Sequence, residues 1–444
     1  MTDKEKILTI LQKILPEDIN AEISVRRESE KETKLRKNTA VESIDRRNHF
    51  VQVRVEQGGR VGVYSTNRLT VSALREALSR ARENASWGRP GPLILTGSTG
   101  YREMDLFSRA TANLSPQSRT ALLAPVFKVA DKAGMAVSGV LSAQAGEYAL
   151  ANTAGLAAWT RATVAQFCAT VTSVDGLGIG YGYACDRNID KLDCLDPFLQ
   201  AAAKCQAADK PRPLTPGKYT VILEPAAVAD LLAVVAETVL NGRAYLEARS
   251  PVTEIGSRIF GENITIWDDA LDSKGLAMPF DFQGVPKQRL NLVSRGVVQN
   301  LALDNETAAS LNRAGTGHAS VPGSNLGPVP AHIFMEPGNA MYDDMITSTK
   351  DGLLISRLHN LVVLDPREGL ITGTTGHGTL LIENGKLKAA LPNLRFVQNL
   401  VQTLNQVEMT GDETRLFGGL WGGMRVPALK IGGFSIIGSN IGYL

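Results

Sequence analysis

The residues most able to support hydrolytic chemistry are the five histidines, His49, His318, His332, His359 and His377. No H-E-x-x-H or H-E-x-x-x-H sequence occurs, and no two histidines stand at helical spacing. A hydrolytic zinc site usually takes such a pair and a third ligand. A metal site would therefore need His318, His359 and His377 to converge in three dimensions. Solvated or hydrogen-bonded histidines are the simpler interpretation.

Carboxylates give a second, weaker signal. Asp268 and Asp269 follow an apolar run, and Asp281 lies in the segment PFDFQ. Paired carboxylates at a strand end can bind a cation or act as acid and base. Turns use the same residues for local backbone hydrogen bonds. We therefore interpret these acids as turn residues.

A third signal is the segment TTGHG at residues 374–378, which we predict to be a loop between strands. Glycine permits close backbone approach, so exposed N–H groups there could bind a carbonyl or a carboxylate. A plain tight β-connection would look the same. No G-x-S-x-G sequence occurs, which argues against a serine hydrolase.

Composition bounds the class of protein that positions these residues. The chain has 444 residues, 43% of them hydrophobic, and its net charge is 47 − 45 = +2. This composition is typical of a globular protein of two or three domains and excludes bulk disorder. The near-neutral charge gives no basic field for direct binding of nucleic acid.

Cysteine usage and hydropathy indicate the compartment. Cys168, Cys185, Cys194 and Cys205 show no C-x-x-C spacing, so we expect reduced thiols in a cytoplasmic protein. The N-terminus lacks the apolar core of a signal peptide. No apolar run reaches the roughly 18 residues of a membrane span, so no membrane contact is expected.

The first half of the chain mixes helices and strands. Apolar spacing and capping residues predict helices at 4–15, 70–84, 189–208 and from Ser115-Pro116 to Gly134. Alternating residues predict a hairpin over 51–64 around Gly58-Gly59, and further strands over 135–183 with a turn at 152–155. We therefore predict an N-terminal domain over 1–208 with mixed helices and an antiparallel sheet.

The second half is predicted to be rich in strands. Residues 209–218 hold three prolines and a glycine, which marks a linker. A strand at 219–223 follows, and then a helix from Pro225 to about 240, apolar on nearly every side and therefore buried. Short strands separated by Gly, Asn and Asp dominate the rest, with a helix at 395–408. The predicted class is α+β, with a barrel-like domain over 219–444 around a buried helix.

Several fragments resemble one known family along nearly the whole chain. They include VQVRVEQGGRVGVYSTNRLTVSALREALSRA, PGKYTVILEPAAVADLL, IGSRIFGENITIWDDALD and DGLLISRLHNLVVLDPREGLITGTTGHGTLLIENGKL. The sequence resembles the TldD/PmbA family, whose members are metallopeptidase-like and were called modulators of DNA gyrase. The resemblance implies one of two kinds of subunit. TldD-like members bind zinc through H-E-x-x-x-H and a later ligand, typically cysteine, whereas TldE/PmbA-like members lack the motif and pair with the first kind.

The ligand positions of that motif fall here near Val239 and Ala244, which cannot bind a metal, and no cysteine follows. An acidic stretch of the family is also altered, because Phe282 and Gln283 replace the acids. The resemblance therefore implies a TldE/PmbA-like chain with no cofactor of its own, zinc being expected in a TldD-like partner. Without zinc there is no activated water and no Lewis acid for the peptide carbonyl.

The role implied for such a subunit is to shape a cavity and hold a peptide. The residues predicted to line it are Arg243, Glu247, His318, Thr375, Gly376 and His377. Arg243, placed on the core helix, could hold a peptide carboxylate through a bidentate pair. It could equally pair with Glu247 one helical turn further on.

Three functions remain open from the sequence. The first is a zinc-free subunit of a TldD/TldE-type peptidase, paired with a zinc-bearing sister or with itself. The second is a self-sufficient peptidase or amidohydrolase whose metal ligands come from His318, His359, His377 and the acids. The third is a binding or regulatory protein that acts without proteolysis.

Overall fold

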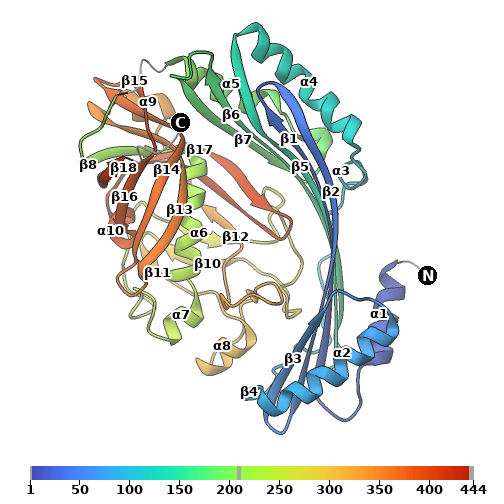
Figure 1. Ribbon diagram of the computed structural model, residues 1–444. Helices are drawn as coiled ribbons and strands as arrows, with labels where there is room; N and C mark the ends of the chain where they lie inside the picture. Colours follow the sequence, from blue (N-terminus) through green and yellow to red (C-terminus); the bar gives the residue numbers. More distant parts are fainter. Residues whose placement is uncertain (1–2, 208–211, 440–444) are drawn as a thin grey trace.

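The computed structural model describes residues 3–207 and 212–439, which form two sheets with helices packed on them (Figure 1). The first sheet has seven antiparallel strands in the order β4-β3-β2-β1-β5-β6-β7. Its strands are β1 (Ala21–Arg36), β2 (Thr39–Gln57), β3 (Arg60–Thr66), β4 (Arg89–Pro90), β5 (Met135–Asn152), β6 (Ala157–Ser173) and β7 (Ile179–Asp186). Figure 1 shows it as a long curved wall beside the rest of the molecule.

Local sequence signals explain part of this sheet. The predicted hairpin over 51–64 is confirmed as β2–β3, turning at Gly58 and Gly59, whose φ angles of 59° and 70° suit glycine. The predicted turn at 152–155 joins β5 to β6. Strand β1 was not predicted, because its outer half is charged and only partly buried.

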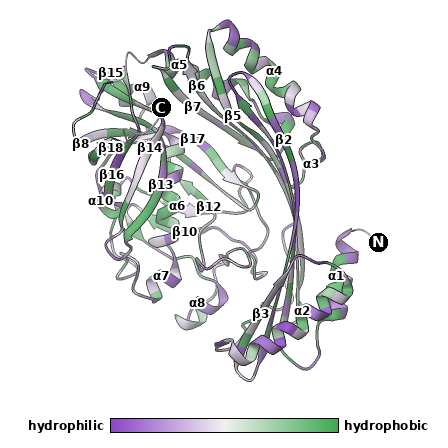
Figure 2. Cartoon of the chain, viewed as in Figure 1, coloured by the Kyte–Doolittle hydropathy of each residue, from purple (hydrophilic) through white to green (hydrophobic). Residues whose placement is uncertain are grey.

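Helices cover both ends of this sheet. They are α1 (Asp3–Ile14), α2 (Val71–Asn84), α3 (Arg109–Ala112), α4 (Pro116–Lys132) and α5 (Leu195–Ala207), with short 3₁₀ turns η1 (Ala85–Trp87) and η2 (Ile189–Lys191). The predicted cap is confirmed: the Ser115 hydroxyl accepts the Ser118 N–H at 3.1 Å. The predicted helix at 189–208 begins later, at Leu195, because a 3₁₀ turn precedes it. In Figure 2, α1 and α2 alternate green and purple, as expected of helices with one buried face.

The second sheet has eleven strands and is closed only in part. They are β8 (Gly217–Leu223), β9 (Ile266–Asp268), β10 (Leu290–Ser294), β11 (Val297–Val298), β12 (His332–Met335), β13 (Asp351–Asp365), β14 (Leu370–Glu383), β15 (Lys386–Leu391), β16 (Leu394–Asn399), β17 (Val407–Gly419) and β18 (Gly422–Ser439). Strands β8, β13, β14, β16 and β18 pair in a closed path, and β12, β9, β10 and β11 extend it as an open sheet. The predicted barrel is therefore a partial ring.

The buried helix of this part is α6 (Pro225–Thr238), as predicted. Its side chains join those of the ring strands in one apolar core. The other helices are short: α7 (Gly242–Leu246), α8 (Asn305–Ser310), α9 (Tyr342–Thr347) and α10 (Leu400–Asn405). The predicted helix at 395–408 is wrong at both ends, because β16 runs to Asn399 and β17 starts at Val407. The Asn399 side chain caps α10 by accepting the Gln402 N–H at 2.9 Å.

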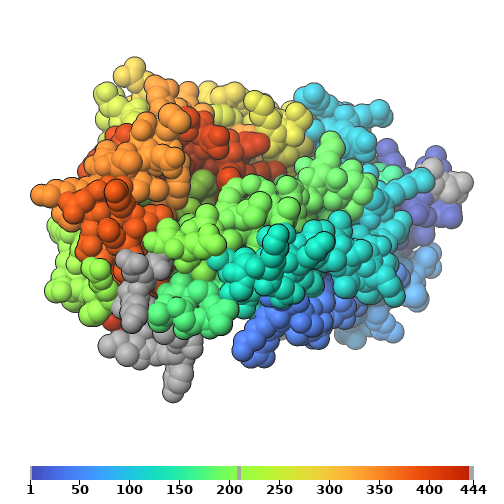
Figure 3. Space-filling model, turned by 90° about the horizontal axis from the view of Figure 1, so that it is seen from above, coloured from blue at the N-terminus to red at the C-terminus, as the bar shows by residue number. Residues whose placement is uncertain are grey.

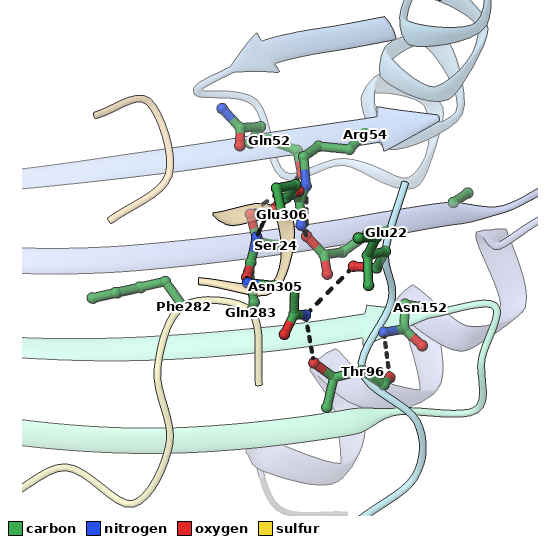
Figure 4. Close-up of polar contacts among 12 residues, drawn as sticks. Glu22, Ser24, Gln52, Arg54, Thr96, Asn152, Phe282, Gln283, Asn305 and Glu306 are labelled. Atoms are coloured by element: carbon green, nitrogen blue, oxygen red, sulfur yellow. Dashed lines mark hydrogen bonds and ion pairs between the residues drawn. The ribbon is translucent and has the colours of Figure 1, made fainter. Parts of the chain in front are cut away.

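Polar contacts join the two parts of the chain. Gln283 Oε1 accepts the Asn305 N–H, and the Asn305 side chain donates to Thr96 Oγ1 at 3.1 Å (Figure 4). Near the other end, Lys204 of α5 pairs with Glu224 at 2.7 Å. Seen from above, the blue-to-green N-terminal half lies along the yellow-to-red C-terminal half in continuous contact (Figure 3).

The structure also bears on the predicted linker, on membrane-spanning helices and on the cysteines. Of the predicted linker at 209–218, residues 209–211 lie outside the described residues, and the strand β8 begins at Gly217. Within the described ranges, no helix has the length and apolar character needed to cross a membrane. The four cysteines are free, and burial raises the pKa of the Cys185 and Cys194 thiols to about 12.

Candidate functional site

The positions implied for zinc ligands are apolar and buried. Val239 follows the last residue of α6 and is 0% exposed, and Ala244 in α7 is 1% exposed. Neither side chain has an atom that can bind a metal. The residues present therefore do not fit zinc at these two positions.

Arg243 and Glu247 lie outside the core helix on which they were predicted. The helix stops because the Asn241 side chain accepts the N–H groups of Arg243 and Ala244 and caps a new helix, α7. Arg243 Nε lies 3.0 Å from Glu247 Oε1, and both side chains are exposed. Hydrogen bonds from Arg249 and then Arg243 lower the pKa of Glu247. The two residues thus form a surface ion pair, and their role toward a substrate stays a prediction.

His318 lies in a different place, fully buried against Asp268. Its Nε2 is 3.2 Å from Asp268 Oδ1, and its Nδ1 is 2.8 Å from Thr316 Oγ1. Asp268 Oδ2 also accepts the His332 N–H at 2.7 Å. Burial alone would raise the pKa of Asp268, but the charges of His318 and Lys287 hold it below its usual range. Asp268 is therefore a buried anion, while Asp269 accepts the N–H of Leu271, as expected of a turn residue.

Thr375, Gly376 and His377 belong to strand β14 and not to the predicted loop. The pairing of β14 with β13 shifts register between Ile355 and Arg357, which forms a bulge. His377 has a φ of 52° at this bulge. Thr375 is buried, and its hydroxyl accepts the Leu394 N–H at 3.0 Å, so it supports the sheet.

The bulge brings His377 against His359 of β13. The two ring centroids are 4.8 Å apart at 76°. A Cβ at Gly376 would lie 2.1 Å from His359 Cδ2, so only glycine leaves room for that ring. His377 also stacks on Tyr181 of β7 at 6.0 Å, and its Nδ1 lies 3.4 Å from Thr170 Oγ1. His377 therefore stands where the two sheets meet.

Arg357, two residues before His359 in β13, is held by an ion pair and a further hydrogen bond. Arg357 binds Asp230 of α6 through two hydrogen bonds of 2.7 and 2.9 Å and donates to the Tyr181 hydroxyl at 2.7 Å. Burial would lower the pKa of Arg357, but its contacts with Asp230 hold it above its usual range. We call Tyr181, Asp230, Arg357, His359 and His377 the inter-sheet cluster.

The electrostatics of the inter-sheet cluster keep its histidines neutral near pH 7. Burial and then the charge of Arg357 lower the pKa of His359. Burial, His359 and Arg357 do the same for His377. A neutral imidazole has one donor and one acceptor nitrogen, and His359 Nε2 has no hydrogen-bond partner among the described residues. The cluster can thus contact a polar group such as a peptide amide.

The structure brings two of the three candidate histidines together. His318 is instead paired with Asp268. Among residues 3–207 and 212–439, no group of three or more His, Cys, Asp or Glu side chains is arranged to hold a metal. Sequence reasoning missed Tyr181, Asp230 and Arg357. The one available signal was Asp230, one of two acidic residues, with Glu237, in a largely apolar helix.

Comparison with known families assigns the chain to a metallopeptidase-like class. Residues 216–438 match the PmbA/TldA metallopeptidase C-terminal domain, and residues 21–85 match the PmbA/TldA metallopeptidase domain 1. The chain therefore belongs to the PmbA/TldD family.

Individual relatives have low sequence identity to this chain, but the matched regions are long. The chain is 22% identical over 405 residues to the metalloprotease PmbA of Escherichia coli O157:H7, covering 86% of this chain and 85% of that protein. A metalloprotease of Methanothermobacter thermautotrophicus is 25% identical over 283 residues, and the match spans only 60% of either protein.

Solved structures share the whole fold. The TldE protein of Thermococcus kodakarensis superposes with a TM-score of 0.86 at 21% identity, covering 98% of this chain and 99% of that one. A Thermotoga maritima protein described as a modulator of a DNA gyrase gives a TM-score of 0.84 at 18% identity, with the same coverage.

Proposed function

We propose that this chain is the zinc-free, TldE/PmbA-like subunit of a two-part cytoplasmic peptidase. Its partner would be a TldD-like sister that carries zinc. The observation that supports this is the chemistry of Val239 and Ala244, which are apolar and sit in the core where the resemblance puts zinc ligands. The likeness to a protein named TldE is in keeping with it.

The contribution of this chain would be shape and binding. The inter-sheet cluster presents two neutral imidazoles. Arg357 of the same cluster is held in place by both Asp230 and Tyr181. Neutral imidazoles can orient a peptide amide through hydrogen bonds. Water activation and polarisation of the peptide carbonyl would belong to the sister subunit.

The proposal is tested by reconstitution. This chain, a TldD-like sister with an intact H-E-x-x-x-H motif, and an equimolar mixture are each incubated with an unstructured peptide, and products are followed by mass spectrometry. We expect cleavage only in the mixture, and one complex of both chains by light scattering. The sister with Gln in place of the motif glutamate is the matched control and should form the complex without cleaving.

Two outcomes would overturn the proposal. Cleavage by this chain alone, with stoichiometric zinc by plasma mass spectrometry, would make it a self-sufficient peptidase. A mixture that neither associates nor cleaves would remove the subunit role. The protein must be purified without chelators or a metal-binding tag, since either would bias the metal content.

A further inference from the structure

A cavity of about 180 Å³ lies in the C-terminal half, apart from the inter-sheet cluster. It is bounded by the loop after His318, the start of β12, the segment 278–287 and the turn between β17 and β18. Its apolar wall is formed by Met278, Phe282, Val321, Leu326, Val329 and Trp421. Leu326 is 44% exposed, so the cavity reaches the surface beside that residue.

Aromatic packing holds part of this wall in place. Phe282 packs edge-on against Trp421 at 6.0 Å and against Tyr148 of β5 at 4.9 Å. Its carbonyl accepts the Tyr148 hydroxyl at 2.8 Å. Figure 4 shows Phe282 pointing away from the polar contacts of Gln283. The wall is therefore fixed by the joint between the two sheets.

Two nearly buried polar side chains also line the cavity. Lys287 is 6% exposed and His332 is 3% exposed. Both ring nitrogens of His332 are fully buried and have no hydrogen-bond partner among the described residues. The Lys287 amine makes no direct hydrogen bond or ion pair with the described part of the chain. A buried cation without a direct partner is costly, and such groups call for a ligand or for water.

Two carboxylates lie near Lys287, those of Asp268 and Asp281, and Asp281 itself borders the cavity. Asp281 accepts the N–H groups of Gln283, Val285 and Ala319, each at 2.9 Å. Asp268 is held by the His332 N–H and His318. Their charges act on Lys287 from a distance, because neither is close enough to form an ion pair with it. The donors of Lys287 thus remain available to the cavity.

The charge of the His332 side chain differs from that of Lys287. Burial lowers the pKa of His332 to about 3, and the charge of Lys287 adds to this effect. Its ring is therefore neutral near pH 7 and places no second charge at the cavity. One cationic donor beside an apolar wall matches a carboxylate attached to an apolar group.

We infer that this cavity binds a small carboxylate with an apolar body, the carboxylate on Lys287 and the body against Phe282 and its neighbours. The volume suits a body of about benzene size, since cavities on the order of 150 Å³ bind benzene. A free acid and the C-terminal residue of a peptide share this chemistry. The inference does not depend on the proposed subunit role.

Ligand-observed fluorine NMR with 4-fluorobenzoate and 4-fluorobenzamide tests it on the full chain. The two probes have nearly the same shape and differ in charge. We expect the acid to bind at least about tenfold more tightly, the effect of a hydrogen bond to a charged group. Equal binding of the two probes would indicate an apolar cavity without a carboxylate site. No binding of either probe would indicate a cavity that only water fills. Either result overturns the inference.

Variants locate the site. Lys287→Met should weaken binding of the acid about tenfold or more, whereas Lys274→Met, the same change on an exposed lysine, should not. Ala331→Leu should block binding by filling the cavity without changing its charge. If Lys287→Met fails to fold, Ala331→Leu and the probe pair still decide. Unchanged binding in Ala331→Leu would place the probe elsewhere and overturn the inference.

A competition experiment distinguishes a free acid from a peptide C-terminus as the source of the carboxylate. N-acetyl-alanyl-leucine and its C-terminal amide are added against bound 4-fluorobenzoate. Displacement by the acid and not by the amide identifies a peptide C-terminus as a fitting ligand. Displacement by neither, with benzoate still bound, confines the site to free small acids. Both results support the carboxylate site, and displacement by both peptides alike would contradict it.

Discussion

Arg54 Nη1 of β2 lies 3.0 Å from Glu306 Oε1 of α8, an ion pair that joins the two halves of the chain (Figure 4). The same guanidinium lies 2.7 Å from Glu22 of β1. Burial alone would lower the pKa of Arg54, but Glu22 and Glu306 together hold it above its usual range. The contact between the first sheet and α8 therefore involves a charge shared by three largely buried groups.

Removing Arg54 should weaken this joint strongly. Arg54→Met leaves two buried carboxylates without a counter-ion, and we expect a loss of about 3–5 kcal/mol in the free energy of unfolding. Arg46→Met is the matched control. Arg46 pairs with Glu30 and Glu32 at 3.4 and 3.6 Å, and its own side chain is 50% exposed, so its loss should stay within about 1 kcal/mol. Urea unfolding measures both. Equal midpoints for the two variants would show that the network does not hold the sheets together.

Stability should fall on mild acidification because of His332. Its pKa is lowered to about 3, so between that value and about 6.5 the unfolded chain binds a proton that the folded chain does not. Stability is therefore lost as the pH falls below 6.5, by about 2 kcal/mol at pH 5 from this residue. His332→Gln should remove that share of the loss, and His49→Gln, at an exposed histidine, should not. A pH series of urea unfolding from 7 to 5 gives the comparison. Parallel curves for wild type and His332→Gln would refute the assignment.

The fold was largely predictable where local signals act. The Gly58-Gly59 turn and the largely apolar character of α6 each specify their element through neighbouring residues. Strand β1 was missed because its charged outer half is paired on both sides by β2 and β5, which are distant in sequence. Non-local pairing overrides local propensity there.

The candidate site was predictable only in part, for the same reason. His377 was singled out by its glycine-rich surroundings, but the segment is a strand bulge and not a loop. Its neighbours His359 and Tyr181 come from two other elements, Asp230 of the same cluster comes from a third, and no spacing in the sequence links them. The break in the helix at Asn241 depends on one side-chain cap, which moved Arg243 to the surface.

Restoring histidines at the implied zinc positions should not restore zinc. Val239→His combined with Ala244→His would place imidazoles where the side chains are 0% and 1% exposed. Each unsatisfied buried group costs about 1–3 kcal/mol, so we expect lower stability and no bound metal by plasma mass spectrometry. Leu246→His, at a 43% exposed position of the same segment, should be nearly neutral. Stoichiometric zinc in the double variant would show that the two positions still face a common site.

Gly376, which leaves room for the His359 ring of the inter-sheet cluster, should be sensitive to substitution. In Gly376→Ala the new Cβ would lie 2.1 Å from His359 Cδ2, so the ring must move away from His377. Overpacking of this kind costs about 1–3 kcal/mol, measurable by thermal unfolding, and the imidazole proton shifts of both histidines should change. Adding His359→Ala removes the collision and should recover most of the stability, while Gly419→Ala, with open space around it, should change little. If the double variant is no more stable than Gly376→Ala, the glycine serves the backbone of β14 and not the histidine contact.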